Sequence, residues 1–434
     1  MYEANINLIQ KRLFLSFVFL APISQKLSTI NIGLLLIVSI LNFQREKFNL
    51  LKGFLFPIGL YLLYCFSLLY SSEFQFGIAE QKASLFVFPI IFMLNKNVKE
   101  YFNLILKFFV FGCLFALIIC ELNALYSSIN FNHLTLIFEP KTNSNNTFYN
   151  SILKSENRFF SYNFSFLHQT VYFSMYLLFS IAILFQKKLF KIKFIQKGIL
   201  LILCIGIFQI LNKASLIAFL FIIILKVYSY FKNKKIAIVS ILMLFIIATS
   251  LFVISPRYKG FNKNFTINKS EIETKDYKKI NNKNPNRTNF RVMLWSSAIE
   301  LIQQNPIMGI GAGGSHKRLY EVFAVKRQWY DKNEKYHTHN QYLQVFLDLG
   351  IIGFFTFFLM FTFFLKNIKK VNNNKDKILI INFLVIVGIN FLFESVFERY
   401  SGISFYCFFY CLLVCYIKPS LQQKNKYLFY NKHF

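Results

Sequence analysis

Two histidines that could take part in acid–base chemistry stand close together in the run His337-Thr338-His339-Asn340. An imidazole with a reference pKa of about 6.5 can take a proton from a hydroxyl group as its oxygen attacks another centre. The apolar run from Gln341 to Leu349 follows directly, which places these rings at the mouth of a helix. An H-x-H pair also binds metal ions, here with His316 or Asp331 as a further ligand, but this spacing alone is a weak signal. We therefore predict a general base and no metal ion.

A cationic side chain and a helix precede the histidines. Apolar residues recur at three- and four-residue spacing from Phe290 to Ile302, which predicts a helix that is capped by Thr288 or Asn289 and stops at Asn305. Arg291 is expected in its first turn, where a guanidinium and free backbone amides suit an anionic group such as a diphosphate. The alternative is an exposed arginine on an amphipathic interfacial helix.

A run of glycines follows this helix. Gly309-Ile-Gly311-Ala-Gly313-Gly314 formally fits the G-x-G-x-x-G pattern of dinucleotide sites. Such a site needs a strand before the glycines and a helix after them in a soluble unit. Here a predicted helix and Pro306 come first. We therefore predict a turn that brings the chain back to the membrane, and no dinucleotide cofactor.

Further ionisable residues lie at the ends of apolar segments. Glu394, Glu398 and Arg399 end a long apolar run, with the two carboxylates one helical turn apart. Ionisable residues in membrane segments are functional candidates, although a local ion pair with Arg399 or a loop lysine is an equal alternative. His168 opens another apolar span, where it belongs either to the site or to a structural hydrogen bond.

The composition indicates lipid as the solvent of most of these segments. The chain has 434 residues, of which 55% are hydrophobic, including 57 Phe and 24 Tyr, more than one soluble core of this size would use. The formal net charge of +30 comes from lysines in short clusters between apolar runs. That placement excludes nucleic acid as a partner, because a nucleic-acid binder needs one soluble basic face. The seven cysteines lie in apolar runs and are expected to pack, without disulfides or zinc.

Apolar runs of about 17 to 25 residues predict an all-α polytopic membrane protein with about 12 transmembrane helices. The clear candidates are residues 54–70, 78–94, 102–122, 163–185, 214–230, 236–254, 378–397 and 401–417. Less secure are 13–23, 30–43 and 198–211, and one more helix follows Gly350.

The distribution of lysine and arginine predicts the orientation. If the N-terminus lies inside, alternate loops are rich in these residues and the short loops between them are poor. The sequence then divides into a helical region at 1–254 with about nine spans and an outer loop at 123–161, and a large extracytoplasmic loop with short helices at 255–340. C-terminal transmembrane helices at 341–417 and a cytoplasmic tail at 418–434 complete the chain.

The stretch from Arg291 to Gly353 resembles the signature region of the O-antigen ligase and O-antigen polymerase superfamily. The family pattern is an Arg before an aromatic residue or Leu, a P-x-x-G-x-G turn, and H-[NSQ]-x9-G-x-x-G leading into a membrane helix. This sequence has Arg291 before Trp295, the turn Pro306-Ile-Met-Gly309-Ile-Gly311, and His339-Asn340 followed by Gly350 and Gly353.

The resemblance implies roles for several of these residues. His339 would be the base that activates an acceptor hydroxyl, and Arg291 would hold the diphosphate of the donor. A second family arginine aligns with Lys213, which keeps the charge but loses bidentate geometry, so an interfacial lysine is the alternative. The remaining candidate substrate-binding residues are Asn340, His337, Glu394, Glu398 and His168.

The implied activity is transfer of a glycan from an undecaprenyl-diphosphate carrier to an acceptor hydroxyl of lipid A core or a similar glycolipid or glycan. It needs no cofactor, and the site would lie on the periplasmic side of the bacterial inner membrane, in contact with membrane lipid. A repeat-unit polymerase of the same family is one alternative. A transporter or flippase of lipid-linked sugars is another, but charged residues or broken helices near mid-membrane would be expected of it.

Overall fold

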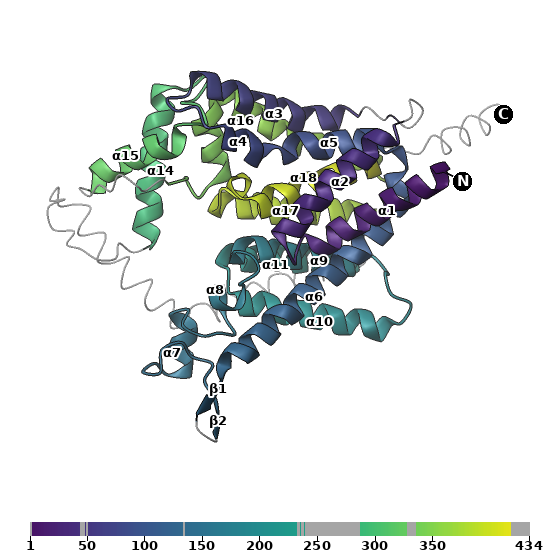
Figure 1. Ribbon diagram of the computed structural model, residues 1–434, viewed down its shortest axis with the longest axis vertical. Helices are drawn as coiled ribbons and strands as arrows, with labels where there is room; N and C mark the ends of the chain where they lie inside the picture. Colours follow the sequence, from purple (N-terminus) through teal and green to yellow (C-terminus); the bar gives the residue numbers. More distant parts are fainter. Residues whose placement is uncertain are drawn as a thin grey trace.

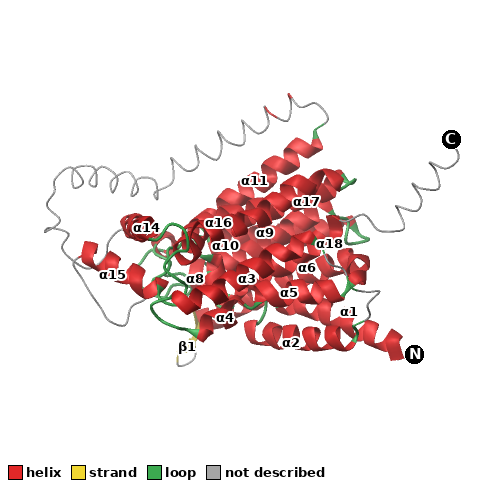
Figure 2. Ribbon diagram, turned by 90° about the horizontal axis from the view of Figure 1, so that it is seen from above, coloured by secondary structure: helices red, strands yellow, loops and turns green. Residues whose placement is uncertain are grey.

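The computed structural model describes residues 2–43, 48, 51–132, 135–231, 235, 238, 287–327 and 336–417. They form a bundle of helices with α14 (Arg287–Gln304) and α15 (Ser315–Arg327) at one end, whereas α1 (Tyr2–Leu20) begins near the other end (Figures 1 and 2). Nearly all of the expected span 236–254 lies outside the described residues, as do Asp331 and the tail 418–434.

The predicted all-α class is confirmed. Within the described ranges the strands are one antiparallel pair, β1 (Ile129–Asn132) and β2 (Thr135–Phe138). The remaining elements are helices: α2 (Gln25–Leu41), α3 (Lys52–Tyr70), α4 (Phe76–Lys82), α5 (Ser84–Leu94), η2 (Lys96–Tyr101), α6 (Phe102–Ser128), α7 (Phe148–Leu153), α8 (Ser161–Phe164), α9 (Thr170–Gln186), α10 (Lys193–Ile210), α11 (Lys213–Tyr230), α16 (Gln341–Asn367), η4 (Ile368–Lys370), α17 (Asn374–Phe393), η5 (Val396–Glu398) and α18 (Tyr400–Ile417).

The expected count of about 12 spans is not confirmed. The described residues hold seven helices that are long and apolar enough to cross a membrane, or eight if the bent pair α4 and α5 counts as one span. This pair bends by 41° where a single span over 78–94 was expected. The expected span 163–185 divides into α8 and the shorter apolar helix α9, with His168 between them.

Helix α18 lies in the centre of the bundle. It packs against α5, α3 and α9, and Phe408 contacts Phe14, Phe17, Phe88 and Phe92. A helix that is apolar all round must be covered on all sides, and α18 is almost completely buried. By contrast α10 and α11 leave many large apolar side chains exposed at the periphery, as expected of helices that face lipid.

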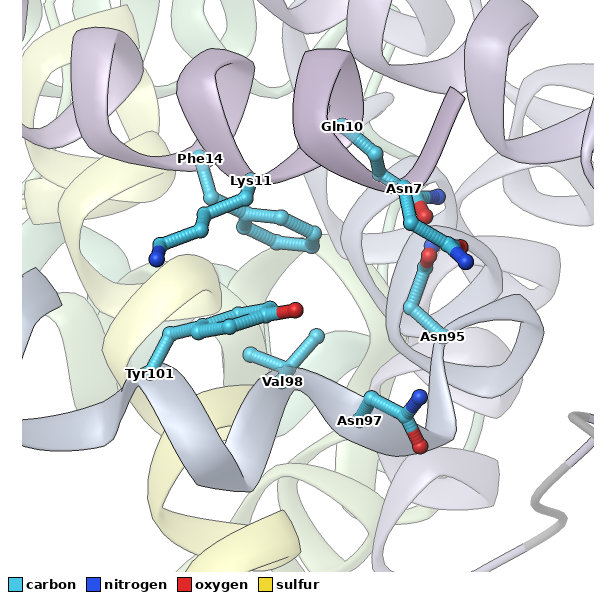
Figure 3. A pocket seen from close by; sticks show the side chains of 8 residues that line it. All are labelled: Asn7, Gln10, Lys11, Phe14, Asn95, Asn97, Val98 and Tyr101. Carbon is cyan, nitrogen blue, oxygen red and sulfur yellow. The ribbon is translucent and has the colours of Figure 1, made fainter. Parts of the chain in front are cut away.

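Basic residues gather at the end of the bundle where α1 begins. The Lys99 and Lys187 ammonium groups each face the ring of Tyr416, and Lys187 Nζ lies 2.6 Å from Asp376 Oδ1 in the first turn of α17. A polar pocket at this end is lined by Asn7, Gln10, Lys11, Phe14, Asn95, Asn97, Val98 and Tyr101 (Figure 3). The segments of Lys99, Lys187 and Asp376, which the charge distribution predicts on one side of the membrane, therefore lie at one end of the bundle.

Candidate functional site

The two helices of the large loop form a second hydrophobic cluster beside the bundle. Leu294, Ala298 and Leu301 of α14 pack against Leu319 and Phe323 of α15, and Leu347 of α16 joins them. The expected helix with its buried apolar stripe is thus present. The described helix begins at Arg287, so Arg291 lies in its second turn and not among its first amides. The indole of Trp295 donates a hydrogen bond to the Thr338 carbonyl at 2.9 Å, which ties α14 to the histidine run.

The glycine turn packs onto a break in α16. Gly350 has a φ of +61°, and there the backbone leaves the helical conformation. The break leaves backbone groups of α16 without helical partners, and the turn forms hydrogen bonds with them. Ile310 N–H donates to the Leu347 carbonyl at 2.9 Å, and Ile351 N–H donates to the Pro306 carbonyl at 2.9 Å. A Cβ on Gly350 would lie 2.2 Å from the Ile307 carbonyl oxygen. The predicted turn is present, and its glycines allow this close backbone approach.

The same turn is fastened to the end of α3. Gly314 N–H donates to Ser71 Oγ at 2.6 Å, Ala312 N–H donates to Ser67 Oγ at 3.2 Å, and the Tyr70 hydroxyl donates to the Met308 carbonyl at 2.6 Å. The start of α16 is therefore held between α3, the turn and α14.

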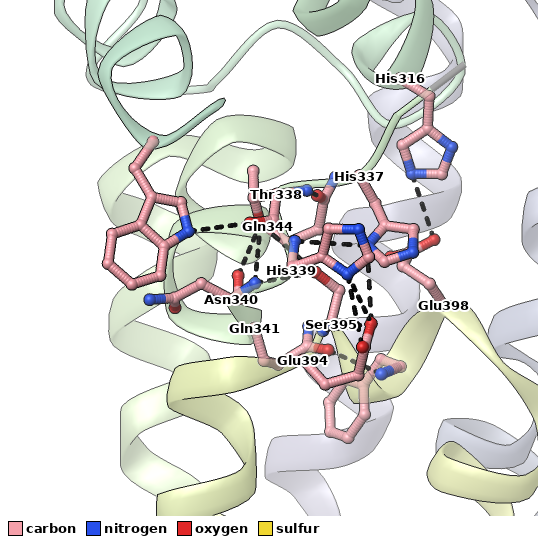
Figure 4. A network of polar contacts seen from close by, with 12 residues as sticks. His316, His337, Thr338, His339, Asn340, Gln341, Gln344, Glu394, Ser395 and Glu398 are labelled. Atoms are coloured by element: carbon pink, nitrogen blue, oxygen red, sulfur yellow. Dashed lines mark hydrogen bonds and ion pairs between the residues drawn. The ribbon is translucent and has the colours of Figure 1, made fainter. Parts of the chain in front are cut away.

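His339 stands at this fixed start of α16 (Figure 4). Asn340 is the N-cap, and its Oδ1 accepts from the backbone of Tyr342 and Leu343 at 3.0 and 3.2 Å. His339 has a φ of +50°, which non-glycine residues rarely adopt. Such strain persists only where the surroundings impose it, and it is common at functional sites. The side chain of Asn340 caps α16 and so helps to fix the position of His339. Its contact with substrate stays a prediction.

Glu394, the first residue after α17, holds the ring of His339. His339 Nδ1 lies 3.2 and 3.3 Å from the two Glu394 carboxylate oxygens. Burial alone would raise the pKa of Glu394, but the hydrogen bond from His339 and the charges of His339, His337 and Arg291 outweigh burial and lower this pKa. Glu394 is therefore ionised at neutral pH. The structure brings four of the predicted site residues together, namely His337, His339, Glu394 and Arg291.

His337 differs from His339 in its hydrogen bonding. Its Nδ1 accepts from the His339 backbone N–H at 3.3 Å, which requires that this nitrogen carries no proton. Burial, together with the charge of His339, lowers the pKa of His337 to about 4 despite the nearby carboxylates of Glu394 and Glu398. The 3.7 Å separation between His337 Nδ1 and Glu394 is therefore not an ion pair at neutral pH.

Glu398 belongs to a buried charged cluster that the sequence did not predict. Lys82 Nζ donates to Glu398 Oε1 at 2.6 Å and to the Phe397 carbonyl at 2.8 Å, and His316 Nε2 lies 3.3 Å from Glu398 Oε2. Burial would raise the pKa of Glu398, but the charge of Lys82 and the hydrogen bond from His316 lower it. Asp348 is buried close by. The sequence suggested an ion pair of Glu398 with Arg399 or a loop lysine. In the structure Glu398 pairs instead with Lys82 and His316, which are distant in the sequence.

One signal for this cluster was present in the sequence. Lys82 interrupts the apolar run over 78–94, and a lysine inside a membrane span calls for an internal partner. His316 follows the glycine turn, and the sequence pattern suggests for it only the role of a metal ligand. The distance of 316 residues between Lys82 and Glu398 gives no local pattern that identifies the partner.

Lys213 and His168 lie near the same end of the bundle. Lys213 begins α11, where Ser215 Oγ of the first turn donates to Asn390 Oδ1 at 3.3 Å. Asn390 precedes Glu394 by one helical turn, so the exposed Lys213 stands at the level of the site. His168 is buried, and its Nδ1 lies 2.9 Å from Ser401 Oγ at the start of α18. This contact fits the structural alternative for His168.

A metal ion is also conceivable at the histidines. One ligand atom each of His337, His339 and Glu394 lies within 4.8 Å of the others. Both imidazole Nδ1 atoms already make hydrogen bonds within this group, so these nitrogens would have to give up those bonds to bind a metal. The prediction of a site without metal stays a prediction, for which chelation is the test.

Fold and site together define a polytopic helical membrane protein with a histidine, carboxylate and arginine cluster at one end of its bundle. Residues 170–358 match the family model described as O-antigen ligase. This similarity supports the predicted resemblance to the O-antigen ligase superfamily. It includes Lys213, Arg291 and His339, whereas Glu394 and Glu398 lie beyond it.

One curated relative adds sequence similarity but no activity. An uncharacterised protein of Haemophilus influenzae (strain ATCC 51907 / DSM 11121 / KW20 / Rd) is 28% identical over 201 residues, which are 45% of this chain and 48% of that protein. The match thus spans about half the length of that relative. The family itself implies an O-antigen ligase- or polymerase-type function, and its members are glycosyltransferase-like enzymes.

Proposed function

We propose that this protein transfers a glycan from an undecaprenyl-diphosphate carrier to an acceptor hydroxyl of lipid A core or a similar glycolipid, on the periplasmic face of the inner membrane. The observation that carries the proposal is the pairing of His339 with Glu394 at 3.2 Å, beside the charge of Arg291. A base and a diphosphate-binding cation are the two groups that this reaction needs most.

In the proposed mechanism, His339 donates its Nδ1–H to the Glu394 carboxylate, and Nε2 is the atom that accepts a proton. Nε2 takes the proton of the acceptor hydroxyl as the acceptor oxygen forms a bond to the anomeric carbon. The bond from that carbon to the diphosphate oxygen breaks, and the electron pair leaves with the diphosphate. Glu394 stabilises the resulting imidazolium, as a carboxylate does in other carboxylate–histidine pairs.

The cations act on the leaving group. Arg291, with support from Lys213, stabilises the charge that develops on the departing diphosphate. Displacement of a diphosphate requires no nucleotide, and positioning with charge stabilisation can supply most of the rate. Attack by the acceptor on the face opposite the leaving group inverts the anomeric configuration.

The test is glycan analysis of a deletion strain that is complemented with wild-type protein or with the His339→Ala variant. For a ligase we expect the loss of all capped surface glycan in the deletion strain, which only the wild-type protein restores. A product with a single repeat unit would identify a polymerase instead.

A purified assay separates both enzymes from a transporter. Detergent-solubilised protein with a labelled lipid-linked donor and an acceptor should yield the transferred glycan, since chemistry needs no sealed membrane. If the purified protein forms no product while it moves the donor across vesicles, the proposed function is wrong.

A further inference from the structure

Three imidazoles line the site, and the carboxylates that contact them lie beneath. The side chains of His316, His337 and His339 keep 28%, 20% and 29% of their surface exposed, whereas Glu394 and Glu398 keep 11% and 5%. The ring centres of His316 and His337 are 6.3 Å apart, and those of His337 and His339 are 4.1 Å apart (Figure 4). A sugar diphosphate that reaches His339 is long enough to reach His316 as well.

The surroundings of His316 favour its cationic form. Burial lowers the pKa of His316, but the hydrogen bond to Glu398, the charge of Glu398 and that of Asp348 outweigh burial and Lys82 and raise it. The charged or titratable groups that face His316 are Glu398 from η5, Asp348 from α16, Lys82 from α4 and His337 from the segment before α16. These contacts therefore favour a proton on His316, whereas burial keeps His337 neutral.

The position of His316 at the start of α15 also favours the binding of an anion. Ser315-His316-Lys317-Arg318 puts three basic side chains in the first turn of α15, although the positive end of a helix dipole favours acidic ones. Lys317 is balanced by Glu73 at 2.7 Å and His316 by Glu398 at 3.3 Å. An anion bound here would gain from the helix end and from the charge of His316, whereas the exposed Lys317 is held by Glu73 and takes no part.

We propose that His316 is a further diphosphate-binding residue of this site, a second cation that contacts the donor while His339 acts on the acceptor. The proposal rests on the proposed function. Glu398 accepts from His316 and thereby orients its ring, and Lys82, which bonds Glu398 and the Phe397 carbonyl from below, holds that carboxylate in place. Glu398 and Lys82 are positioning residues. The neutral His337 separates the cation from the base.

The test uses the full chain in detergent and inorganic pyrophosphate as the probe, with binding measured by calorimetry at about pH 6 and pH 9. A hydrogen bond to a charged group is worth enough that His316→Gln should weaken pyrophosphate binding about 10-fold to 100-fold at pH 6. At pH 9 the ratio of the two affinities should approach one, because the wild-type ring loses its proton as pH rises through its pKa. The ratio is the readout, since pyrophosphate itself gains charge over this range.

Two further variants keep the result independent of folding. His316→Arg keeps a charge at both pH values, so it should bind pyrophosphate at least as well as wild type and hold its advantage over His316→Gln at pH 9. Lys317→Gln removes the neighbouring exposed cation and should change the affinity less than threefold. Pyrophosphate affinity that is equal in wild type and His316→Gln at pH 6, or a wild-type protein that does not bind pyrophosphate, overturns the proposal.

The two proposals fail in different ways. If His316→Gln weakens pyrophosphate binding but the wild-type protein transfers no glycan, the anion site stands and the proposed function falls. If His339→Ala stops transfer while His316→Gln leaves both pyrophosphate affinity and transfer unchanged, the proposed function stands and His316 has no part in it.

Discussion

At the residue scale, His337 and His339 stand two positions apart in the sequence and differ in their environments. His339 is held by Glu394 through Nδ1 and stands at the start of α16, whereas His337 accepts a backbone hydrogen bond and stays neutral. Removal of a general base typically costs about 100-fold to 10,000-fold in rate. We expect His339→Ala to abolish glycan transfer in a purified assay with protein level and donor binding nearly intact, and His337→Ala to be much milder.

A chelator provides the control for this assignment. Because the proposed reaction uses no metal, excess chelator should leave the wild-type rate unchanged. If His337→Ala is the more damaging change, or if chelation stops transfer, the base assignment fails. The three ligands His337, His339 and Glu394 would then be reconsidered as a metal site.

Lys213 tests how much of the diphosphate contact depends on charge alone. Its position at the start of α11, beside the end of α17, places an ammonium group at the level of Glu394. If Lys213 contacts diphosphate as a point charge, Lys213→Arg should retain activity and Lys213→Ala should lose about tenfold or more. The measurement is the rate of glycan transfer by the two purified variants. Equal rates would mean that Lys213 only anchors α11 at the membrane interface.

At the element scale, the break in α16 fixes where His339 stands. Gly350 combines a φ of +61° with a Cβ position 2.2 Å from the Ile307 carbonyl oxygen. Gly350→Ala therefore has to shift backbone, and we expect a loss of about 2 kcal/mol or more in stability together with most of the transfer activity. Thermal unfolding in detergent is the measurement.

Gly198 in α10 is the matched control for this substitution. An added Cβ there meets nothing within 4 Å, and the backbone is helical. Gly198→Ala should be neutral or stabilising by up to about 1 kcal/mol. A Gly350→Ala protein as stable and active as Gly198→Ala would mean that the break does not position the site.

The helices could be predicted from the sequence because long apolar runs leave few other structures in lipid. The pattern from Arg291 to Gly353 likewise identified His337 and His339, which the structure brings together with Glu394. The 41° bend before α5 and the inward Lys82 were missed, because both sit inside a run that is apolar on average. The pairing of Lys82 and His316 with Glu398 depends on which helix ends meet in space, and no local periodicity encodes that.

At the scale of the whole molecule, two different groups of charged residues lie at the two ends of the bundle. Lys99, Lys187 and Asp376 mark one end, and the histidine cluster with Glu394 marks the other, at opposite ends of α17. The positive-inside rule assigns the lysine-rich end to the cytoplasm. We therefore expect the site to face the periplasm, where a lipid-linked donor would meet its acceptor.

Reporter fusions test this orientation directly. A reporter that is active only in the periplasm should be active when fused near Asn284, which precedes α14 in the large loop, and silent near Asn373, which caps α17 at the lysine-rich end. A reporter that works only in the cytoplasm should give the opposite result at both positions, which controls for poor expression. Because α17 runs from Asn374 to Phe393 and Glu394 follows it, the side found for Asn373 also fixes the side of Glu394 when α17 spans the membrane. The reversed pattern in both reporters would place His339 and Glu394 on the cytoplasmic face, away from a periplasmic acceptor, and the proposed transfer reaction would have to be abandoned.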